Sequence, residues 1–483
     1  MAYTEYEYTN PVKLLVASDA QKHEAIQFFL SYGFKNPQPG EIGIEVGQVL
    51  LSVLEKNKTK VTVSLGEKEN ISANTLRKTG ASITKWLNQF SKTSSTIHLT
   101  EIDHFDKKDM LSAFLEGLYL GSYTFSKWKS TAKKSDEIKI YLDTNIEPQK
   151  VKPLIKHARI VTEAVNMGRD WAHEPANVIN PVSLAQRVQV LAQTHGLKCT
   201  ILDESTLSQI KAGGILSVGQ GSKTPSRLII LEYPGSHAAP ETKPIVLIGK
   251  AITFDTGGYS LKDTANIQNM KYDKSGGIAV VAVMQAVAAL KIKNPVIGMI
   301  AAAENMISQQ AYRPDDIITT LSGKTVEVIT TDAEGRLILA DALTYAQQKY
   351  NPEAMIDLAT LTGGVVVALG RVRAGLMSNN DVLANALLAS GESTHERLWR
   401  LPLDQDYFSQ IEGDDADLKN SGGREATPVI GGIFLKEFVS NQIPWAHIDI
   451  AGVANTDKPN NLGPKGATGF GIRLLIDFLE KFK

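Results

Sequence analysis

The sequence has a single cysteine, Cys199, among its 483 residues. A disulfide within the chain is therefore impossible, and a metal site built from cysteines is excluded. The formal net charge is -1, so the chain as a whole is not attracted to nucleic acid or to an anionic membrane. A metal site in this chain must therefore use oxygen or nitrogen ligands. Binding partners cannot be predicted from the net charge.

Long hydrophobic runs are also lacking. The most apolar run, residues 276–290, is shorter than a bilayer span and ends in a lysine-containing turn. The N-terminal residues, Met-Ala-Tyr-Thr-Glu-Tyr-Glu-Tyr, lack the charged and apolar regions of a signal peptide. Hydrophobic residues make up 43% and charged residues 21%, close to globular averages. We therefore expect a soluble cytoplasmic protein with no membrane association.

Several common catalytic motifs are missing. None of the nine histidines lies in His-Glu-x-x-His, because in His173-Glu174-Pro175 the proline breaks the helix and no second histidine follows. Gly219-Gln220-Gly221 does not complete a dinucleotide fingerprint, and no phosphate loop occurs. A Gly-x-Ser-x-Gly nucleophile elbow is absent too. Helical zinc proteases, dinucleotide enzymes and serine hydrolases are therefore disfavoured.

Strand-like and helix-like segments alternate along the chain. At about 150 residues per domain the length predicts two or three domains, and the alternation predicts α/β layers around a mixed, mostly parallel sheet. In the first part we expect strands at 12–17, 41–54, 60–65, 96–99 and 137–142, and helices at 22–32, 73–90 and 108–128. In the second we expect helices at 182–194, 275–290 and 337–348, strands at 227–232, 244–254, 296–303 and 354–358, and a hairpin at 317–330.

A mixed-charge stretch at 148–171 has helical spacing. It is either a helix that connects two domains or the last helix of the first one. We divide the chain into a smaller N-terminal α/β domain at 1–150, a connecting helix at 151–172 and a larger C-terminal α/β domain at 173–483.

Carboxylates follow or precede the predicted elements of the second part. Asp255 stands at the carboxyl end of a probable central strand, the edge at which open α/β sheets bind ligands. Asp273 comes just before an apolar helix. Asp332 and Glu334 are two residues apart, so they would point to the same side of an extended segment. Arg336 would share that side if the chain stayed extended.

Clustered carboxylates repel one another and need cations to hold them together. Lysines and arginines are one remedy and divalent metals the stronger one. Oxygen ligands suit Mg²⁺, Mn²⁺ or Zn²⁺, and four carboxylates are enough for a bridged pair. Each piece also has an ordinary alternative, as a turn, a helix cap or a solvated group. The spacing thus predicts a carboxylate-rich metal site.

These segments resemble those of the leucyl aminopeptidases, also called cytosol aminopeptidases. Residues 330–337 are similar to the family's Asn-Thr-Asp-Ala-Glu-Gly-Arg-Leu, with Thr330 in place of Asn, and 249–258 resembles its other metal segment. Further similarity lies at 313–314, 357–363, 422–425, 445–452 and 465–469. The resemblance covers about residues 170–483, whereas the first 150 residues match only in length and alternation.

The resemblance implies two divalent metal ions per subunit, zinc or manganese, with magnesium or cobalt as alternatives at one site. It implies that Asp255 and Glu334 bridge the ions. Lys250 and Asp273 would complete the ligands of one ion. Asp332 would bind the other through its carboxylate and its backbone carbonyl. A lysine ligand must lose a proton, which a nearby dication promotes.

The resemblance also implies an activity, the release of N-terminal residues, leucine or other apolar ones, from peptides. Lys262 would polarise the scissile carbonyl and stabilise the oxyanion. Arg336 would hold a bicarbonate ion that acts as general base. The metals would supply a hydroxide and bind the free amine of the substrate, which explains exopeptidase action. A homohexamer with its sites facing an interior cavity is implied as well.

The expected first side-chain pocket is less specific, and ordinary packing is the alternative for its residues: Met270, Thr360, Leu361, Gly363, Ala451 and Ala454. Each methylene in such a pocket is worth roughly 1–3 kcal/mol, so preference for leucine would be modest. The sequence departs from the usual family pattern at Ala251, Thr256, Tyr259, Tyr272, Lys274, Gln309 and Asp315. Lys274 stands where methionine is usual, which leaves metal preference and specificity open.

Two rival functions remain. Another two-metal hydrolase, such as a phosphatase, would also suit a carboxylate cluster. A DNA-binding regulatory role would need a basic patch, and the best candidate is Lys127, Lys129, Lys133 and Lys134 around Trp128. This patch runs into Asp136-Glu137, so a solvated helix end is the simpler interpretation. We do not expect nucleic acid as a partner, and a salt-dependent gel shift tests this.

Overall fold

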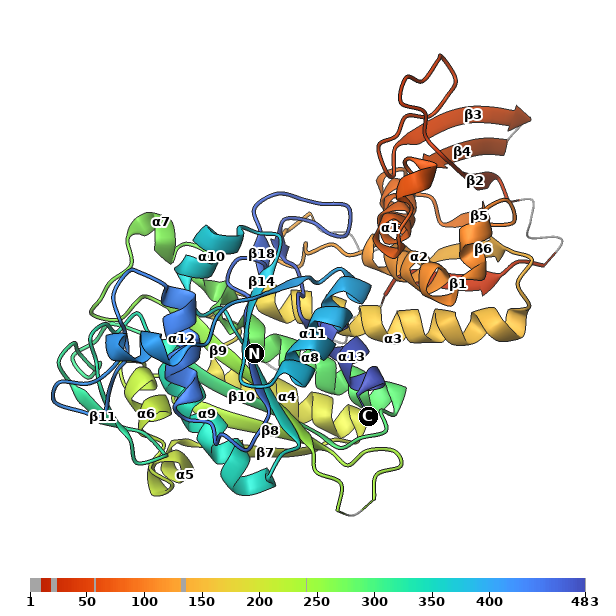
Figure 1. The fold of residues 1–483 in the computed structure, drawn as a ribbon. Helices are drawn as coiled ribbons and strands as arrows, with labels where there is room; N and C mark the ends of the chain where they lie inside the picture. Colours follow the sequence, from red (N-terminus) through yellow and green to blue (C-terminus); the bar gives the residue numbers. More distant parts are fainter. Residues whose placement is uncertain (1–9, 19–23, 56–57, 132–135, 240, 483) are drawn as a thin grey trace. The chain divides into compact units, whose positions relative to one another are not determined.

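The computed structural model describes residues 10–18, 24–55, 58–131, 136–239 and 241–482. The chain forms two compact units, one of residues 1–166 with 457–466 and one of residues 167–456 with 467–483 (Figure 1). Each unit has its own sheet and its own hydrophobic core. The predicted fold class, a smaller N-terminal and a larger C-terminal α/β part, is confirmed.

The first unit contains a six-stranded sheet in the order β1-β6-β5-β2-β4-β3. All neighbouring strands are parallel except β3 and β4. The strands are β1 (Val12–Val16), β2 (Ile26–Ser31), β3 (Val49–Glu55), β4 (Lys58–Ser64), β5 (Ser94–His98) and β6 (Ile138–Asp143). The helices are η2 (Lys68–Asn70), α1 (Ala73–Gln89), η3 (Asp103–Asp106) and α2 (Lys108–Leu120).

Two predictions in this unit were wrong. The segment expected as a helix at 22–32 is the strand β2 over its described part, paired in parallel with β4 and β5. Phe29 interrupts the alternation of Ile26, Phe28 and Leu30 with polar residues, so this short, largely apolar run fits a helix as well as a strand. Helix α2 ends at Leu120 and not at 128, and Trp128 lies in a turn with 59% of its surface exposed.

The described part of the candidate basic patch therefore does not lie at a helix end. Lys127 lies in the same turn, with its ammonium 5.4 Å from the centre of the Trp128 ring. Lys133 and Lys134 lie outside the described residues. The expectation that this patch does not bind nucleic acid stays a prediction.

A 26-residue helix, α3 (Pro148–His173), confirms the helical pattern at 148–171. The division between the two compact units falls inside this helix, after Asn166. The boundaries that we drew at 150 and 172 stay a prediction.

The second unit is built on an eight-stranded sheet in the order β15-β14-β17-β13-β9-β10-β8-β7. The four central strands β17, β13, β9 and β10 are parallel, and antiparallel pairs lie outside them. The strands are β7 (Lys198–Leu202), β8 (Arg227–Tyr233), β9 (Ile245–Asp255), β10 (Val296–Asn305), β13 (Ala354–Ala359), β14 (Ala374–Ser378), β15 (Leu398–Arg400) and β17 (Trp445–Asp449).

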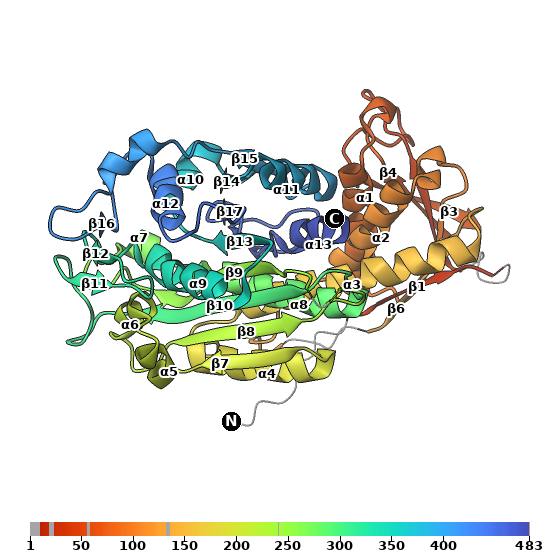
Figure 2. The same ribbon diagram turned by 60° about the horizontal axis from the view of Figure 1, so that its bottom comes forward.

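Helices cover both faces of this sheet. On one face α8 (Ser275–Leu290) contacts β9, β10 and β13, together with α4 (Pro181–His195) and α13 (Ile472–Lys481). On the other face α9 (Glu334–Tyr350) contacts β9 and β10, with α6 (Gly213–Gly219) and α12 (Thr427–Lys436) beside it (Figure 2). Successive residues of β9 point to opposite faces, so a Cβ at Gly249 would meet α8, whereas Lys250 reaches α9.

The remaining elements connect these layers. They are α5 (Glu204–Gln209), α7 (Thr264–Ile267), η4 (Met270–Lys274), β11 (Ile317–Thr319), β12 (Thr325–Glu327), α10 (Gly363–Leu369), α11 (Asp381–Thr394), η5 (Gln405–Gln410), β16 (Leu418–Lys419), β18 (Asn455–Thr456) and β19 (Gly466–Ala467). The antiparallel pair β11 and β12 confirms the predicted hairpin. Among the described residues, the helical stretch Met270–Leu290 is long and apolar enough to cross a membrane, but 72% of its tested window is buried, as in a core helix.

Candidate metal centre

Strand β9 positions the first two candidate residues. Its burial on both faces makes it a central strand, with Lys250 in its middle and Asp255 at its carboxyl end. The side chain of Lys250 runs past the first turn of α9, where Gly335 leaves room for it. A Cβ added at Gly335 would lie 2.7 Å from Nζ of Lys250. The glycine is therefore required for this path.

The ammonium of Lys250 joins two carboxylates inside the protein. Its Nζ lies 2.9 Å from Oδ2 of Asp273 and 2.7 Å from Oε1 of Glu334, and only 3% of the lysine side chain is exposed. It also donates a hydrogen bond of 2.9 Å to the carbonyl oxygen of Thr360. The hydroxyl of Thr360 donates to Oδ1 of Asp273 at 2.6 Å. Three elements, β9, η4 and α9, thus meet at one lysine.

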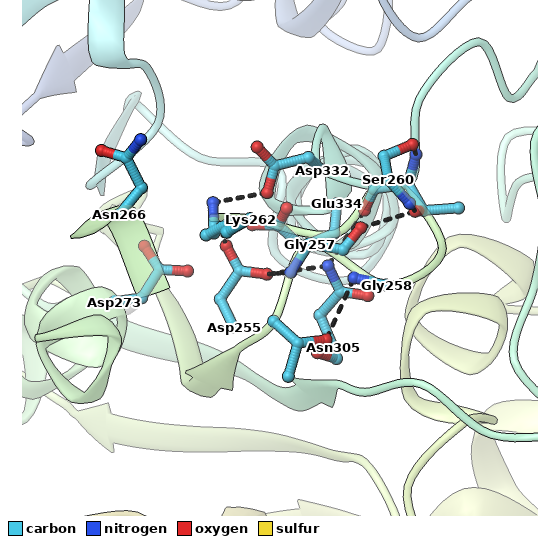
Figure 3. A network of polar contacts seen from close by, with 12 residues as sticks. Asp255, Gly257, Gly258, Ser260, Lys262, Asn266, Asp273, Asn305, Asp332 and Glu334 are labelled. Atoms are coloured by element: carbon cyan, nitrogen blue, oxygen red, sulfur yellow. Dashed lines mark hydrogen bonds and ion pairs between the residues drawn. The ribbon is translucent and has the colours of Figure 1, made fainter. Parts of the chain in front are cut away.

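Asp255 is held on both carboxylate oxygens. Its Oδ1 accepts hydrogen bonds of 2.8 Å from the backbone N–H of Gly257 and from Nδ2 of Asn305. Its Oδ2 lies 2.9 Å from Nζ of Lys262, which also forms an ion pair with Asp332 (Figure 3). Lys262 therefore joins the carboxylate that follows β9 to the carboxylate that precedes α9.

The predicted residues form one cluster. Ligand oxygens of Asp255, Asp273 and Glu334 all lie within 4.8 Å of one another, and all three residues are buried. Asp332 joins them through Lys262. All five residues predicted as metal ligands lie together, because the four carboxylates surround Lys250 and Lys262. Figure 3 shows the four carboxylates and Lys262.

Electrostatics in this cluster favour an added cation. Burial raises the pKa of Glu334 to about 8, and the Asp255 charge adds to that rise against the opposing Lys250. Burial also raises the pKa of Asp273 to about 6. Burial lowers the pKa of Lys250 and Lys262, but the surrounding carboxylates outweigh it and raise both above the ordinary value.

The charges do not cancel when every group is ionised, because four carboxylates face two ammonium groups. Within the described residues, Oε2 of Glu334 is buried without a hydrogen-bond partner. Buried charged oxygens are costly unless they are paired or bind a metal. Carboxylate oxygens are the ligands that divalent cations such as Mn²⁺ and Mg²⁺ prefer, so the residues present fit such ions.

The expected extended conformation between Asp332 and Glu334 was wrong. Asp332 lies in a turn, and Glu334 is the first residue of helix α9. An acidic residue in the first turn is favoured by the helix dipole, which explains why the helix starts at this position. Asp332 and Glu334 therefore converge because the chain turns between them, and not because it is extended.

Arg336 lies inside α9 and is 6% exposed. Its Nη1 donates a hydrogen bond of 2.8 Å to the carbonyl oxygen of Asn420, and its guanidinium lies 5.8 Å from the centre of the Phe434 ring. Burial lowers its pKa to about 10, although Glu334 opposes this shift. Its Nε has no hydrogen-bond partner within the described part of the chain, so a donor remains for an anion.

Sequence reasoning missed Asn305, the last residue of β10. Its amide donates at 2.8 Å to Asp255 and at 2.9 Å to the carbonyl oxygen of Thr331. The hydroxyl of Tyr312 donates to the same carbonyl at 2.7 Å. Asn305 ends the parallel strand next to β9, so the strand-edge argument that identified Asp255 could have identified it too.

Asp449 was also missed. It ends β17, and its Oδ1 accepts hydrogen bonds from the backbone N–H of Leu361 at 3.0 Å and of Ala451 at 3.2 Å. Its Oδ2 accepts a bond of 2.7 Å from the hydroxyl of Thr362. This buried carboxylate therefore ties the loop after β13 to the loop after β17.

The six expected pocket residues lie on segments at the carboxyl edge of the parallel strands. Met270 opens η4, Thr360, Leu361 and Gly363 follow β13, and Ala451 and Ala454 follow β17. A Cβ at Gly363 would meet open space. Ala454 is 3% exposed and borders a void of about 10 Å³ with Ala172 and Ser275. That the six line one substrate pocket stays a prediction.

Comparison with known proteins agrees with this site. The catalytic domain of the cytosol aminopeptidase family matches residues 166–476, and the N-terminal domain of the same family matches residues 45–132. The N-terminal match corrects the expectation that the first 150 residues resemble the family only in length and alternation.

Relatives of this chain include probable cytosol aminopeptidases of Rickettsia canadensis (strain McKiel), 40% identical over 447 residues, and of Rickettsia bellii (strain OSU 85-389), 40% identical over 446 residues. Each alignment covers 90% of this chain and 88% of the relative. Among solved structures, the bottromycin maturation enzyme BotP in complex with Mn is similar, with a TM-score of 0.86 and 29% identity over 94% of this chain and 99% of that one.

Both halves of the sequence thus match one family of metallo-exopeptidases, and the family resemblance predicted from the metal segments is confirmed. The chain belongs to the cytosol aminopeptidase family and is a metal-dependent aminopeptidase.

Proposed function

We propose that the buried cluster is a two-metal centre that removes N-terminal leucine or other apolar residues from peptides. The observation that carries this proposal is the approach of Asp255, Asp273 and Glu334 within 4.8 Å in a buried position. Asp255 and Glu334 would each contribute to both ions, Lys250 and Asp273 to one, and Asp332 to the other. Bound metals lower the pKa of water and polarise a carbonyl, which is the chemistry that peptide hydrolysis needs.

Lys250 would serve as a ligand only as a neutral amine. In the described structure its Nζ lies 2.7 Å from Glu334 and 2.9 Å from Asp273. Lys250 would therefore need to move little to change from an ion-pair partner of these carboxylates to a ligand of the same metal ion. A dication favours loss of the lysine proton because like charges repel. Lys250 would then bind a metal ion in place of the two carboxylates and stay within the cluster.

Lys262 would stabilise the negative charge that develops on the scissile carbonyl oxygen. Its side chain is 15% exposed and its raised pKa keeps it charged at neutral pH. A fixed cation aimed at a developing oxyanion is a large contributor to catalysis. Metal binding by Asp255 and Asp332 would release Lys262 from its two ion pairs for this role.

Arg336 would bind a bicarbonate ion that accepts a proton from the attacking water. Its buried guanidinium has an unpaired Nε within the described residues and stays charged, which supports anion binding. The pocket for the first side chain would be lined by the residues on the loops after β13 and β17, together with Met270.

The metal, the assembly and the compartment belong to the same proposal. The manganese complex of BotP supports manganese, and zinc, cobalt or magnesium would fit the same oxygen ligands. We propose a cytoplasmic location, which the relatives named cytosol aminopeptidases support, and a homohexamer, which the family resemblance implies. Val367 and Val372, which are 90% and 60% exposed, are candidates for an interface between copies. Light scattering would report six chains of 52.5 kDa.

Metal removal and replacement test the proposal. The protein is stripped with a chelator, then Mn²⁺, Zn²⁺ or Co²⁺ is restored, and leucine amide, other aminoacyl amides and a phosphate ester are assayed. We expect metal-dependent release of the N-terminal residue and no hydrolysis of the phosphate ester. Amide hydrolysis that persists in the stripped protein would contradict the proposal.

Two variants separate the proposed roles. Glu334→Gln should lose metal and activity together, because it removes a ligand charge from the centre. Lys262→Ala should keep its metal and lose rate by roughly 10²–10³-fold, as expected when one oxyanion donor is removed. Equal loss of metal in the two variants would contradict the assignment.

A further inference from the structure

A second lysine is buried beside the metal centre, and it does not belong to the cluster of carboxylates. Lys274 ends the turn η4, follows Asp273 directly and is 0% exposed. Burying an ammonium group costs several kcal/mol unless its N–H groups are bonded. The N–H groups of Lys274 therefore need hydrogen-bond acceptors inside the protein.

Those acceptors are three backbone carbonyl oxygens. Nζ of Lys274 donates to the carbonyl of Ala172 at 3.1 Å, of Glu174 at 2.8 Å and of Lys271 at 2.5 Å. An ammonium group has three donors, so this set, the carbonyl cage, satisfies all of them. Carbonyl oxygens around a single positive charge also form the environment that a monovalent cation such as K⁺ takes.

Two of the three carbonyls belong to the end of a long helix. Ala172 lies in the last turn of α3, and Glu174 is the first residue after it. The last carbonyls of a helix lack partners within the helix and carry a partial negative charge, so they favour a cation. Pro175 follows and cannot continue the helix. Lys274 therefore binds the carboxyl end of α3 as a cation would.

The same turn presents Asp273 to the metal centre. Asp273 is held on its other side by Thr360 and Lys250. Tyr272, between Lys271 and Asp273, adds a second contact with α3, because its hydroxyl lies 3.4 Å from Nδ1 of His173 and the two rings meet edge to face. The turn is thus fastened to α3 at two points, and one of them is a buried charge.

We propose that Lys274 is a positioning residue whose ammonium replaces a bound monovalent cation in the carbonyl cage and thereby fixes the turn that presents Asp273. The proposal rests on the proposed role of Asp273 as a metal ligand. Without the ammonium, three carbonyl oxygens are left in a buried space without a donor. The turn would then separate from α3, and Asp273 would no longer be held for the ion.

The test uses Lys274→Ala in the full chain, with the metal removed and Mn²⁺ then titrated by calorimetry. We expect the Mn²⁺ affinity to fall roughly 10- to 100-fold, the usual effect of losing a group that orients a ligand. In the metal-free variant, hydrogen exchange at residues 268–276 should be faster than in the unmodified protein. Added ammonium, methylammonium or K⁺ should restore both properties, whereas tetramethylammonium, which is too large for the carbonyl cage, should not.

Two further variants keep the test decisive. Lys274→Met introduces the residue that is usual in the family at this position and removes the charge, so it should lose Mn²⁺ affinity in buffer without monovalent cations and regain it when K⁺ is added. Lys271→Ala is the matched control in the same turn. It removes a half-buried ammonium but keeps the backbone carbonyl, and it should bind Mn²⁺ as the unmodified protein does.

Unchanged Mn²⁺ affinity in Lys274→Met without monovalent cations, or a loss in Lys274→Ala that none of the cations restores, would overturn the role of Lys274. Asp273→Asn, measured in parallel, separates this from the proposed function. If that variant keeps its Mn²⁺ affinity, the ligand role of Asp273 fails. If only the Lys274 variants behave as the unmodified protein, the inference about Lys274 fails alone.

Discussion

Gly335 shows how a residue without a side chain can determine the position of one with a long side chain. Lys250 extends from the middle of β9 along the first turn of α9, and any Cβ at position 335 would lie 2.7 Å from its Cδ, Cε and Nζ. Real Cβ atoms do not approach other atoms this closely, so Lys250 would have to move. Its contacts with Asp273 and Glu334 would then be lost.

We therefore expect Gly335→Ala to lower metal affinity and activity by at least about 10-fold, and the free energy of unfolding by about 1–3 kcal/mol through overpacking. Metal titration and thermal unfolding measure the two effects. Gln348→Ala, at an exposed position of the same helix, is the control. Unchanged metal affinity in Gly335→Ala would show that the Lys250 side chain can move without weakening metal binding, which would contradict this prediction.

The carboxylates of the cluster also predict a pH dependence. In the metal-free protein the pKa of Glu334 is raised to about 8 and that of Asp273 to about 6, above their unfolded values. The native state therefore binds more protons than the unfolded state between about pH 4 and pH 8, so their contribution to stability is present at low pH and is lost as the pH rises through this window.

Metal binding must displace those protons. We expect the apparent affinity for Mn²⁺ to rise between pH 6 and 8, with protons released on binding. Calorimetry in two buffers of different ionisation enthalpy counts the released protons. An affinity that is independent of pH across this range would contradict the protonated state of Glu334.

At the scale of elements, the strand edge was predictable and the conformation after it was not. Asp255 was identified because carboxyl ends of central parallel strands bind ligands, and the same rule applies to Asn305 and Asp449. Residues 332–334 were expected to be extended, but the helix α9 begins at Glu334. Asp332 and Glu334 still reach one site because the chain turns between them, so the pair was identified although its backbone conformation was not.

The prediction of a helix at residues 22–32 failed for a different reason. In β2, Phe29 breaks the alternation of apolar and polar residues, and a short apolar run of this kind fits a helix equally well. Pairing with β4 and β5, which lie far along the chain, determines that the segment is a strand. Local sequence does not contain that information.

The loops after β13 and β17 act together through Asp449. Replacing it by alanine removes the acceptor of Leu361 N–H, Ala451 N–H and the Thr362 hydroxyl. We expect Asp449→Ala to raise KM and lower kcat/KM for leucine amide by about 10-fold or more, because buried donors are left unpaired and the loop shifts. The amount of bound metal should stay the same, since Asp449 contacts none of the proposed ligands in the described structure. A loss of metal in step with activity would contradict this division.

At the scale of the whole molecule, length and alternation predicted two or three domains of α/β layers, and the metal segments were enough to predict the family. The relationship of the N-terminal part to the family was not visible in its residues, although residues 45–132 match the family's N-terminal domain. Its strands and helices preserve a hydrophobic pattern and carry no catalytic motif. The metal could not be predicted because the same oxygen ligands suit several divalent ions.

The central claim is that the cluster around Lys250 and Lys262 binds two divalent ions and that these ions support aminopeptidase activity. It is tested most directly by titrating the stripped protein with Mn²⁺ while the bound metal per chain and the hydrolysis of leucine amide are both recorded. We predict saturation at two ions per chain, with hydrolysis rising as they bind and neither ion retained tightly by Glu334→Gln. Full hydrolysis before any metal is bound, or two tightly bound ions in Glu334→Gln, would contradict the account.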